Sequence, residues 1–121
     1  MQAPLQLAGT EQTPQVTLNK EKGIFEFSGR SLTDKAIDFY RPIIQWLTEY
    51  SESPNPRTEV VFKMEYMNTS SSKALFDFFA ILQGIDGAKV VWCFQDEDED
   101  MEETGEEFSS LLKIPFEMRA L

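Results

Sequence analysis

Histidine is absent from the sequence, and cysteine occurs once, as Cys93. Without histidine the chain has no Ser-His-Asp or Cys-His catalytic centre, and it lacks the commonest transition-metal ligand. A single cysteine excludes an intramolecular disulfide and a structural zinc site built by one chain, and it suits a reducing cytoplasm. No apolar run approaches the roughly 20 residues that cross a bilayer, and no secretory leader is visible. We therefore expect a soluble, cytoplasmic protein without membrane insertion.

Basic residues are also absent from one strongly acidic segment, residues 96–107. This segment holds nine of the 21 acidic residues; the other 12 are almost balanced by 11 Lys and Arg, so most of the net charge of −10 is local. Nucleic-acid binding needs clustered Lys and Arg to replace phosphate counterions, so we expect no nucleic-acid partner. With 41% hydrophobic residues, a chain of 121 residues can bury its own core, which predicts a single domain over residues 1–121.

Apolar periodicity predicts strands and helices in alternation. We expect strands at residues 5–7, 16–18, 24–28, 58–67, 88–94 and 115–119, and helices over 32–50, over 74–82 and in the second half of the acidic segment. This order predicts an α/β fold: a single-layer mixed sheet with parallel crossovers and helices mainly on one face. Phe25, Phe27 and Trp92 are expected in the core.

The first long helix has two local signals. Ser31 and Asp34 have the spacing of a capping box, which predicts a helix that begins near Leu32. Pro42 lies inside the apolar stripe of this helix and removes one backbone donor. We therefore expect a kink or an irregular turn near residues 38–40.

The stretch from Thr58 to Lys73 joins an alternating strand to a helix, with Phe62 and Tyr66 expected to point into the core. The junction is polar and consists of Asn68, Thr69, Ser70, Ser71 and Ser72. Such side chains commonly accept hydrogen bonds from the first amides of a helix, so capping is the simplest interpretation. The same amides and the helix dipole favour an anion, so a phosphorylated hydroxyl is the alternative.

Four motifs together resemble the SiaC family of bacterial regulatory phosphoproteins, and the resemblance spans nearly the whole chain. They are Gly29-Arg30-Ser31; Phe39-Tyr40-Arg41-Pro42 with Trp46; residues 65–73, Glu-Tyr-Met-Asn-Thr-Ser-Ser-Ser-Lys; and Asp98-Glu99-Asp100-Met101-Glu102-Glu103 with Gly105-Glu106-Glu107-Phe108. The polar run between strand and helix is the most specific of them. One departure is Leu32-Thr33-Asp34, where many members have an aromatic residue, a proline and a glutamate.

The resemblance implies a fold like that of STAS domains, the anti-sigma-factor antagonists, and a non-enzymatic role in signal transduction without metal or cofactor. It implies that a partner kinase phosphorylates Thr69, surrounded by Asn68, Ser70, Ser71, Ser72 and Lys73, and that a PP2C-type phosphatase removes the phosphate. The unphosphorylated form would bind and activate a diguanylate cyclase, raising cyclic di-GMP and promoting biofilm formation and aggregation. Exposed residues on and before the first helix, Arg30, Lys35 and Arg41, are candidate partner contacts.

The acidic segment supports an alternative of another class, a divalent-cation site or metal-dependent enzyme. Its ligands would be Asp96, Asp98, Asp100, Glu102 and Glu103. Hard cations prefer clustered carboxylates, and the first three have the spacing of a calcium loop. Position six of that loop needs glycine, whereas this chain has Met101 there, so the signal is weak.

Two further alternatives concern the polar junction. Ser70 or Ser71 with Lys73 would suit a serine-nucleophile hydrolase, but no oxyanion motif or other base accompanies them. The chain would otherwise be an interaction module that is never phosphorylated. Only the family resemblance argues against this last reading.

Overall fold

The computed structural model describes residues 2–121 and contains one six-stranded sheet with three helices. The elements are β1 (Leu5–Leu7), β2 (Gln15–Asn19), β3 (Ile24–Ser31), α1 (Ala36–Tyr50), β4 (Thr58–Met67), α2 (Thr69–Leu82), β5 (Ala88–Phe94), α3 (Glu99–Leu111) and β6 (Phe116–Ala120). The strands lie side by side in chain order; β1, β2 and β3 pair antiparallel, and β3 to β6 pair parallel. The predicted mixed α/β sheet is confirmed. Met1, which the predicted domain over residues 1–121 includes, lies outside the described residues.

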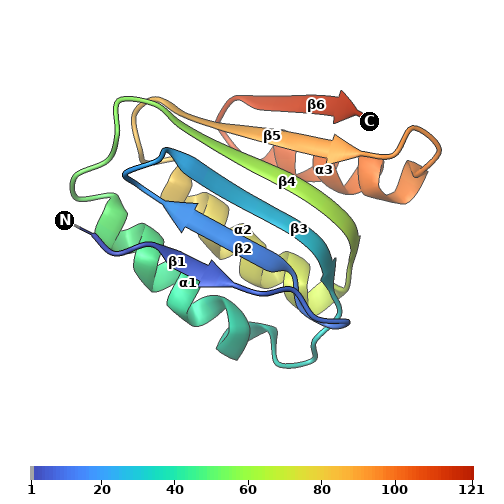
Figure 1. Ribbon diagram of the computed structural model, residues 1–121. Coiled ribbons are helices and arrows are strands. Elements are labelled where there is room, and N and C mark those ends of the chain that lie inside the picture. Colours follow the sequence, from blue (N-terminus) through green and yellow to red (C-terminus); the bar gives the residue numbers. More distant parts are fainter. Residues whose placement is uncertain (1) are drawn as a thin grey trace.

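All three helices lie on the same face of the sheet (Figure 1). Each of them connects two neighbouring parallel strands, and every connection advances one strand in the same direction. Because such crossovers are right-handed, successive helices pack on the same side. None of the helices in residues 2–121 has the length and apolar character that a membrane span requires.

The core lies between this helical layer and the sheet. Phe27, Phe62 and Trp92 come from adjacent strands and stack on one another, with ring centroids 4.7 Å apart for the first pair and 5.4 Å for the second. Phe78 and Phe79 of α2 pack edge-on against Phe62. Helix α2 is therefore held by aromatic contacts along one side, which fixes where its first residue lies.

Gly105 lets α3 approach the sheet closely. A side chain at this position would place its first carbon 2.7 Å from both Trp92 Nε1 and Met118 Cε, which is far inside normal contact distance. The indole of Trp92 also donates a hydrogen bond of 2.9 Å to the carbonyl of Met101. The predicted core position of Trp92 is confirmed. Helix α3, which contains most of the acidic segment, is held against the sheet by these contacts on its buried side.

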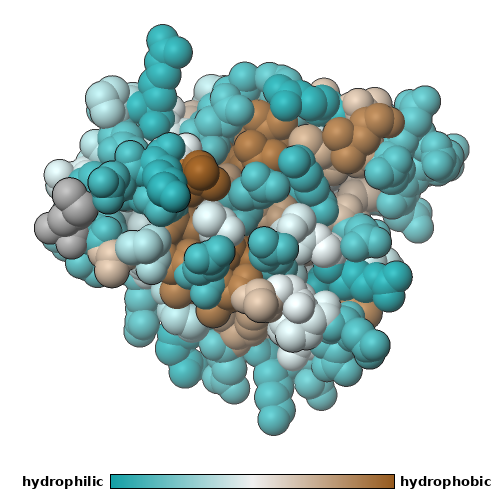
Figure 2. Space-filling view, in the orientation of Figure 1, coloured by the Kyte–Doolittle hydropathy of each residue, from teal (hydrophilic) through white to brown (hydrophobic). Residues whose placement is uncertain are grey.

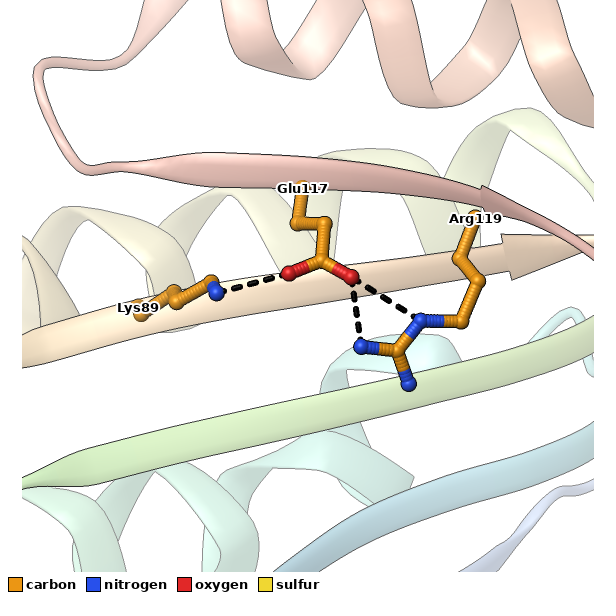
Figure 3. A network of polar contacts seen from close by, with 3 residues as sticks. All are labelled: Lys89, Glu117 and Arg119. Carbon is orange, nitrogen blue, oxygen red and sulfur yellow. Dashed lines mark hydrogen bonds and ion pairs between the residues drawn. The ribbon is translucent and has the colours of Figure 1, made fainter.

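The opposite face of the sheet carries no helix among the described residues and is mostly hydrophilic, with hydrophobic patches between the polar side chains (Figure 2). Lys63 pairs with Glu26 across β3 and β4 at 3.4 Å. On β5 and β6, Glu117 accepts hydrogen bonds from Lys89 at 2.7 Å and from Arg119 Nε at 2.9 Å (Figure 3). These hydrogen bonds lower the pKa of the Glu117 carboxyl, and the bond from Lys89 has the larger effect.

The inward orientation predicted for Tyr66 is wrong, because the side chain is 53% exposed. Gly29 pairs with Met64, but Arg30 pairs with Tyr66, so Glu65 is an extra residue in β4. A bulge of this kind shifts the two-residue alternation by one, which moves every later side chain to the other face. Tyr66 therefore shares the outer face with Arg30.

The predicted start of the first helix is also wrong. Ser31 is the last residue of β3 and is fully buried, and α1 begins at Ala36, after Lys35, without a side-chain cap. Thr33 instead accepts a hydrogen bond of 3.0 Å from the Lys35 amide. Helix α1 continues through Pro42 without a break, so the irregular turn predicted at residues 38–40 does not occur. The proline leaves only the carbonyl of exposed Asp38 without its helical donor.

Candidate functional site

Asn68 closes the junction between β4 and α2. Its side-chain oxygen accepts a hydrogen bond of 2.8 Å from the Ser71 amide, and its side-chain nitrogen donates one of 3.1 Å to the Thr33 carbonyl. The Asn68 amide donates to the Ser31 carbonyl at 3.0 Å. Asn68 is thus a helix N-cap that also ties the start of α2 to the segment between β3 and α1.

A buried chain of three hydroxyl groups supports the junction from below. Ser71 Oγ donates to the Ser31 carbonyl at 3.0 Å and accepts from Ser31 Oγ at 2.7 Å. Ser31 Oγ lies 2.8 Å from the hydroxyl of Tyr40, which must be the donor because the single Ser31 proton is already used. Ser31, Ser71 and Tyr40 are at most 1% exposed. Ser71 is therefore a structural side chain without access to solvent.

Thr69 and Ser70 differ from Ser71 because both are exposed at the start of α2. Thr69 is the first residue of the helix, and its hydroxyl forms no hydrogen bond within residues 2–121. The amides of Ser71 and Ser72 are occupied by the side chain and the carbonyl of Asn68. The amides of Thr69 and Ser70 precede the first intrahelical bond and remain available to an anion.

Two grooves flank the start of α2. The larger, of about 650 Å³, lies between α1 and α2, and Ser70, Lys35 and Arg41 line it. The smaller, of about 250 Å³, lies between α2 and α3 and contains Thr69. Lys73 lines both. Ser70 therefore opens onto the larger groove and Thr69 onto the smaller one.

The predicted partner contacts fall into two places. Lys35 and Arg41 lie along the groove between α1 and α2, and Arg41 forms an exposed ion pair of 3.6 Å with Asp38. Such exposed pairs contribute little stability, so the guanidinium is free to exchange partners. Arg30 is on the outer face of β3 beside Tyr66, so the fold does not place it with the other two.

The acidic residues do not converge. The side chain of Asp98 caps α3 by accepting from the Met101 amide at 3.1 Å, and Asp100 and Glu102 follow in the first helical turn. Within the part of the chain that the structure describes, no group of three acidic or sulfur ligands is arranged to hold a metal ion. The acidic residues in the first turn of α3 instead suit the helix dipole, which favours negative charge at the start of a helix.

The serine-hydrolase arrangement is not assembled either. Ser71 uses its hydroxyl on Ser31, and across residues 2–121 Lys73 forms no hydrogen bond with Ser70 or Ser71. An adjacent base is the usual means of activating a serine nucleophile, and Lys73 is not in hydrogen-bond contact with either serine within these residues. The geometry therefore presents an accessible hydroxyl rather than an activated one.

Sequence patterns missed the contribution of three other elements, β3, α1 and α3, to this site. Ser31 and Tyr40 come from β3 and α1, and neither has a local pattern that points to Ser71. Thr104, Glu107 and Leu111 of α3 form the wall of the groove opposite Thr69. Their spacing of three and four residues places them on one side of a helix, which is a usable signal. It does not indicate which helix they face.

The hydroxyl chain predicts a dependence of stability on alkaline pH. Burial raises the pKa of Tyr40 to about 12, although a hydrogen bond from Ser31 to the ionised phenolate acts in the opposite direction. Above the unfolded value of about 10, the unfolded chain binds fewer protons than the folded chain, so the free energy of unfolding falls as pH rises. We expect Tyr40→Phe to lose less stability than the wild type, by roughly 2 kcal/mol, between neutral pH and about pH 12. Urea unfolding of both proteins measures this, and equal losses would contradict it.

Comparison with known proteins supplies the wider context. Residues 7–121 match the family described as SiaC family regulatory phosphoprotein. The chain is 26% identical over 120 residues to an uncharacterized protein of Pseudomonas aeruginosa, a match that covers 96% of this chain and 95% of that protein.

Two solved structures from Pseudomonas aeruginosa are similar in fold. The crystal structure of apo-SiaC has a TM-score of 0.87 at 24% identity, over 98% of this chain and 99% of that chain. A chain in the crystal structure of diguanylate cyclase SiaD in complex with its activator SiaC has a TM-score of 0.89 at 26% identity. The second match covers 97% of this chain and 99% of that chain.

Proposed function

Because the chain belongs to the SiaC family of regulatory phosphoproteins, we propose that it is a non-enzymatic partner-switching protein controlled by reversible phosphorylation of Thr69. The observation that carries this proposal is the difference between neighbouring hydroxyls. Thr69 is exposed and has no hydrogen-bond partner in residues 2–121, whereas Ser71 is fully buried and bonded to Ser31. A kinase can reach the first hydroxyl without unfolding the helix, and it cannot reach the second.

The proposed output is the activation of a diguanylate cyclase, which would raise cyclic di-GMP and promote biofilm formation and aggregation. Its support is the similarity to the SiaC chain that binds diguanylate cyclase SiaD as its activator in Pseudomonas aeruginosa. A cognate protein kinase would add the phosphate, and a PP2C-type phosphatase would remove it. We place these events in the cytoplasm and in a single domain, as the composition predicts.

The charges around Thr69 explain how a phosphate would act. It adds about −1.5 to −2 charges beside the first amides of α2 and one helical turn before Lys73, which can pair with it. Glu107 lines the same groove and would repel it. The phosphate therefore changes the surface between α2 and α3 while the buried contacts of α2 remain in place. A partner that covers this surface would have to desolvate a dianion, which is costly.

The partner surface extends, in this proposal, from Thr69 to the exposed cations nearby. Lys35 and Arg41 share the groove between α1 and α2 with Ser70 and Lys73. Arg30 lies on a different face and would touch only a partner that wraps around the end of β3.

The phosphorylation site is tested by incubating the protein with its kinase and ATP and then mapping the product by fragment mass spectrometry. We expect phosphate on Thr69 alone, because it is the exposed first residue of α2. Ser70→Ala is the matched control and should be phosphorylated as fully as the wild type. Phosphate on Ser70 or Ser71 of the native protein would move the site and overturn the assignment.

A further inference from the structure

The strand β6 forms an open edge of the sheet. Within residues 2–121 it pairs only with β5, and it lies at the outer margin of the sheet (Figure 1). Natural proteins protect such edges with very short strands, charged side chains (lysine above all), proline or bulges. The other edge, β1, has only three residues, whereas β6 has five, without lysine, proline or a bulge. The two edges therefore differ: β6 is the longer one, and its two charged side chains, Glu117 and Arg119, have opposite signs.

The backbone of β6 has a fixed set of groups available for pairing. Val90 N–H donates to the Pro115 carbonyl at 2.9 Å, and Leu121 N–H donates to the Phe94 carbonyl at 2.8 Å. The odd-numbered residues of this segment thus direct their backbone groups towards β5. Because these directions alternate along a strand, the amides and carbonyls of Phe116, Met118 and Ala120 point away from the sheet.

We propose that β6 pairs antiparallel with β6 of a second copy of this chain, about a two-fold axis at Met118, to form a homodimer with one continuous sheet. In this register Met118 faces its own copy and Phe116 faces Ala120 of the second copy. These are the residues whose backbone groups are free, so each facing pair exchanges two hydrogen bonds. A two-fold interface needs such a self-complementary surface.

The side chains of β6 are complementary in the same register. Glu117 of one copy faces Arg119 of the other, twice across the axis, in the pairs that do not share backbone hydrogen bonds. Side chains approach most closely in pairs of this kind, and opposite charges there are stabilising. Glu117 and Arg119 already contact each other within one chain, together with Lys89 (Figure 3). The dimer extends this network across the axis.

Pairing would also bury more of the apolar side chains on the helix-covered face of β6. Phe116 and Met118 are only half-buried, whereas Val90 and Trp92 on the neighbouring strand are 0% exposed. The second copy would cover the apolar side chains at this end of the core. The acidic side chains of α3 oppose association, so the assay belongs at physiological ionic strength, where the Debye length is about 8 Å.

Sedimentation equilibrium of the full chain over a wide concentration range tests the proposal. We expect the apparent mass to rise from 13.9 kDa towards twice that value as concentration increases. Ala120→Pro should stay at the monomer mass, because it removes an outward amide that β5 does not use. Proline is tolerated on an edge strand at such a position, and circular dichroism checks that the variant is folded.

Two charge reversals make the register itself testable. Arg119→Glu would place glutamate against Glu117 of the second copy, and Glu117→Arg would place arginine against Arg119, so each variant alone should remain monomeric. An equimolar mixture of the two should form a heterodimer, because every facing pair is then of opposite charge. A wild-type chain that stays at 13.9 kDa at all concentrations would overturn the proposal. Dimers that persist in Ala120→Pro and in both charge variants would also overturn it.

Discussion

Thr69→Ala is expected to hold the chain in its partner-binding form even when the kinase and ATP are present. The hydroxyl is exposed and unbonded within the described residues, so its loss removes the phosphate acceptor and leaves the hydrogen bonds of Asn68 and Ser71 in place. Cyclase activity in a reconstituted mixture should then be insensitive to the kinase, whereas the wild type should lose its activating effect. The measurement is the rate of cyclic di-GMP formation before and after addition of the kinase.

Two further variants delimit this result. Ser70→Ala should still be switched off by the kinase, because Ser70 opens onto the other groove. Thr69→Glu should reproduce the phosphorylated state only in part, since one carboxylate carries less charge than a phosphate with about −1.5 to −2. If the kinase still silenced Thr69→Ala, the switch would lie at another residue.

Phe62→Ala is expected to cause the largest loss of stability, about 3–5 kcal/mol. The ring is 0% exposed and lies against Phe27 at 4.7 Å, Phe79 at 5.2 Å and Trp92 at 5.4 Å. Its removal leaves a cavity beneath α2, and a domain has only about 5–15 kcal/mol of stability in total. Urea unfolding of the variant and the wild type gives the difference in the free energy of unfolding.

Phe76→Ala is the matched control because Phe76 is on the same helix layer but is 38% exposed. Its loss should cost about 1 kcal/mol, the typical effect of a point substitution. Equal destabilisation by the two variants would show that the stacked rings of Phe27, Phe62 and Trp92 do not form the centre of the core.

The apolar pattern was sufficient to predict the sheet, because its strands and helices have strong and different periods. Alternation in β4 and the three- and four-residue spacing in α2 reflect one buried face each, as Phe62 and Phe78 illustrate. The order of elements then left few topologies, since parallel crossovers are right-handed. The likeness to anti-sigma-factor antagonists stays a prediction.

The errors arose where a tertiary contact overrides a local signal. The bulge opposite Gly29 inserts Glu65, and nothing in the alternation of β4 shows it. Tyr66 therefore follows the alternation of inward-facing residues in the sequence, but its side chain lies on the outer face of the sheet. Ser31 has the spacing of a helix cap, yet its hydroxyl bonds to Tyr40 and Ser71 instead, which required knowledge of how α1 and α2 pack.

The sequence predicts only that the site lies in the polar junction before α2, and the fold shows which of its hydroxyl groups are exposed and which are buried. Four consecutive hydroxyl residues look alike in sequence, and helical geometry places Thr69, Ser70 and Ser71 in different directions. Only the contact with Ser31 shows that Ser71 is buried. Only the packing of α3 shows that Glu107 shares a groove with Thr69. Which hydroxyl carries the phosphate stays a prediction.

Calorimetric titration of the cognate diguanylate cyclase with the unphosphorylated protein, and with the same preparation after full phosphorylation by the kinase, tests the switch most directly. We expect binding by the unphosphorylated form and an affinity at least about tenfold weaker after phosphorylation, a difference of about 1.4 kcal/mol or more. Circular dichroism of both forms should be the same, because the phosphate lies on the surface. Equal affinity of the two forms for the cyclase would show that phosphorylation does not control this interaction.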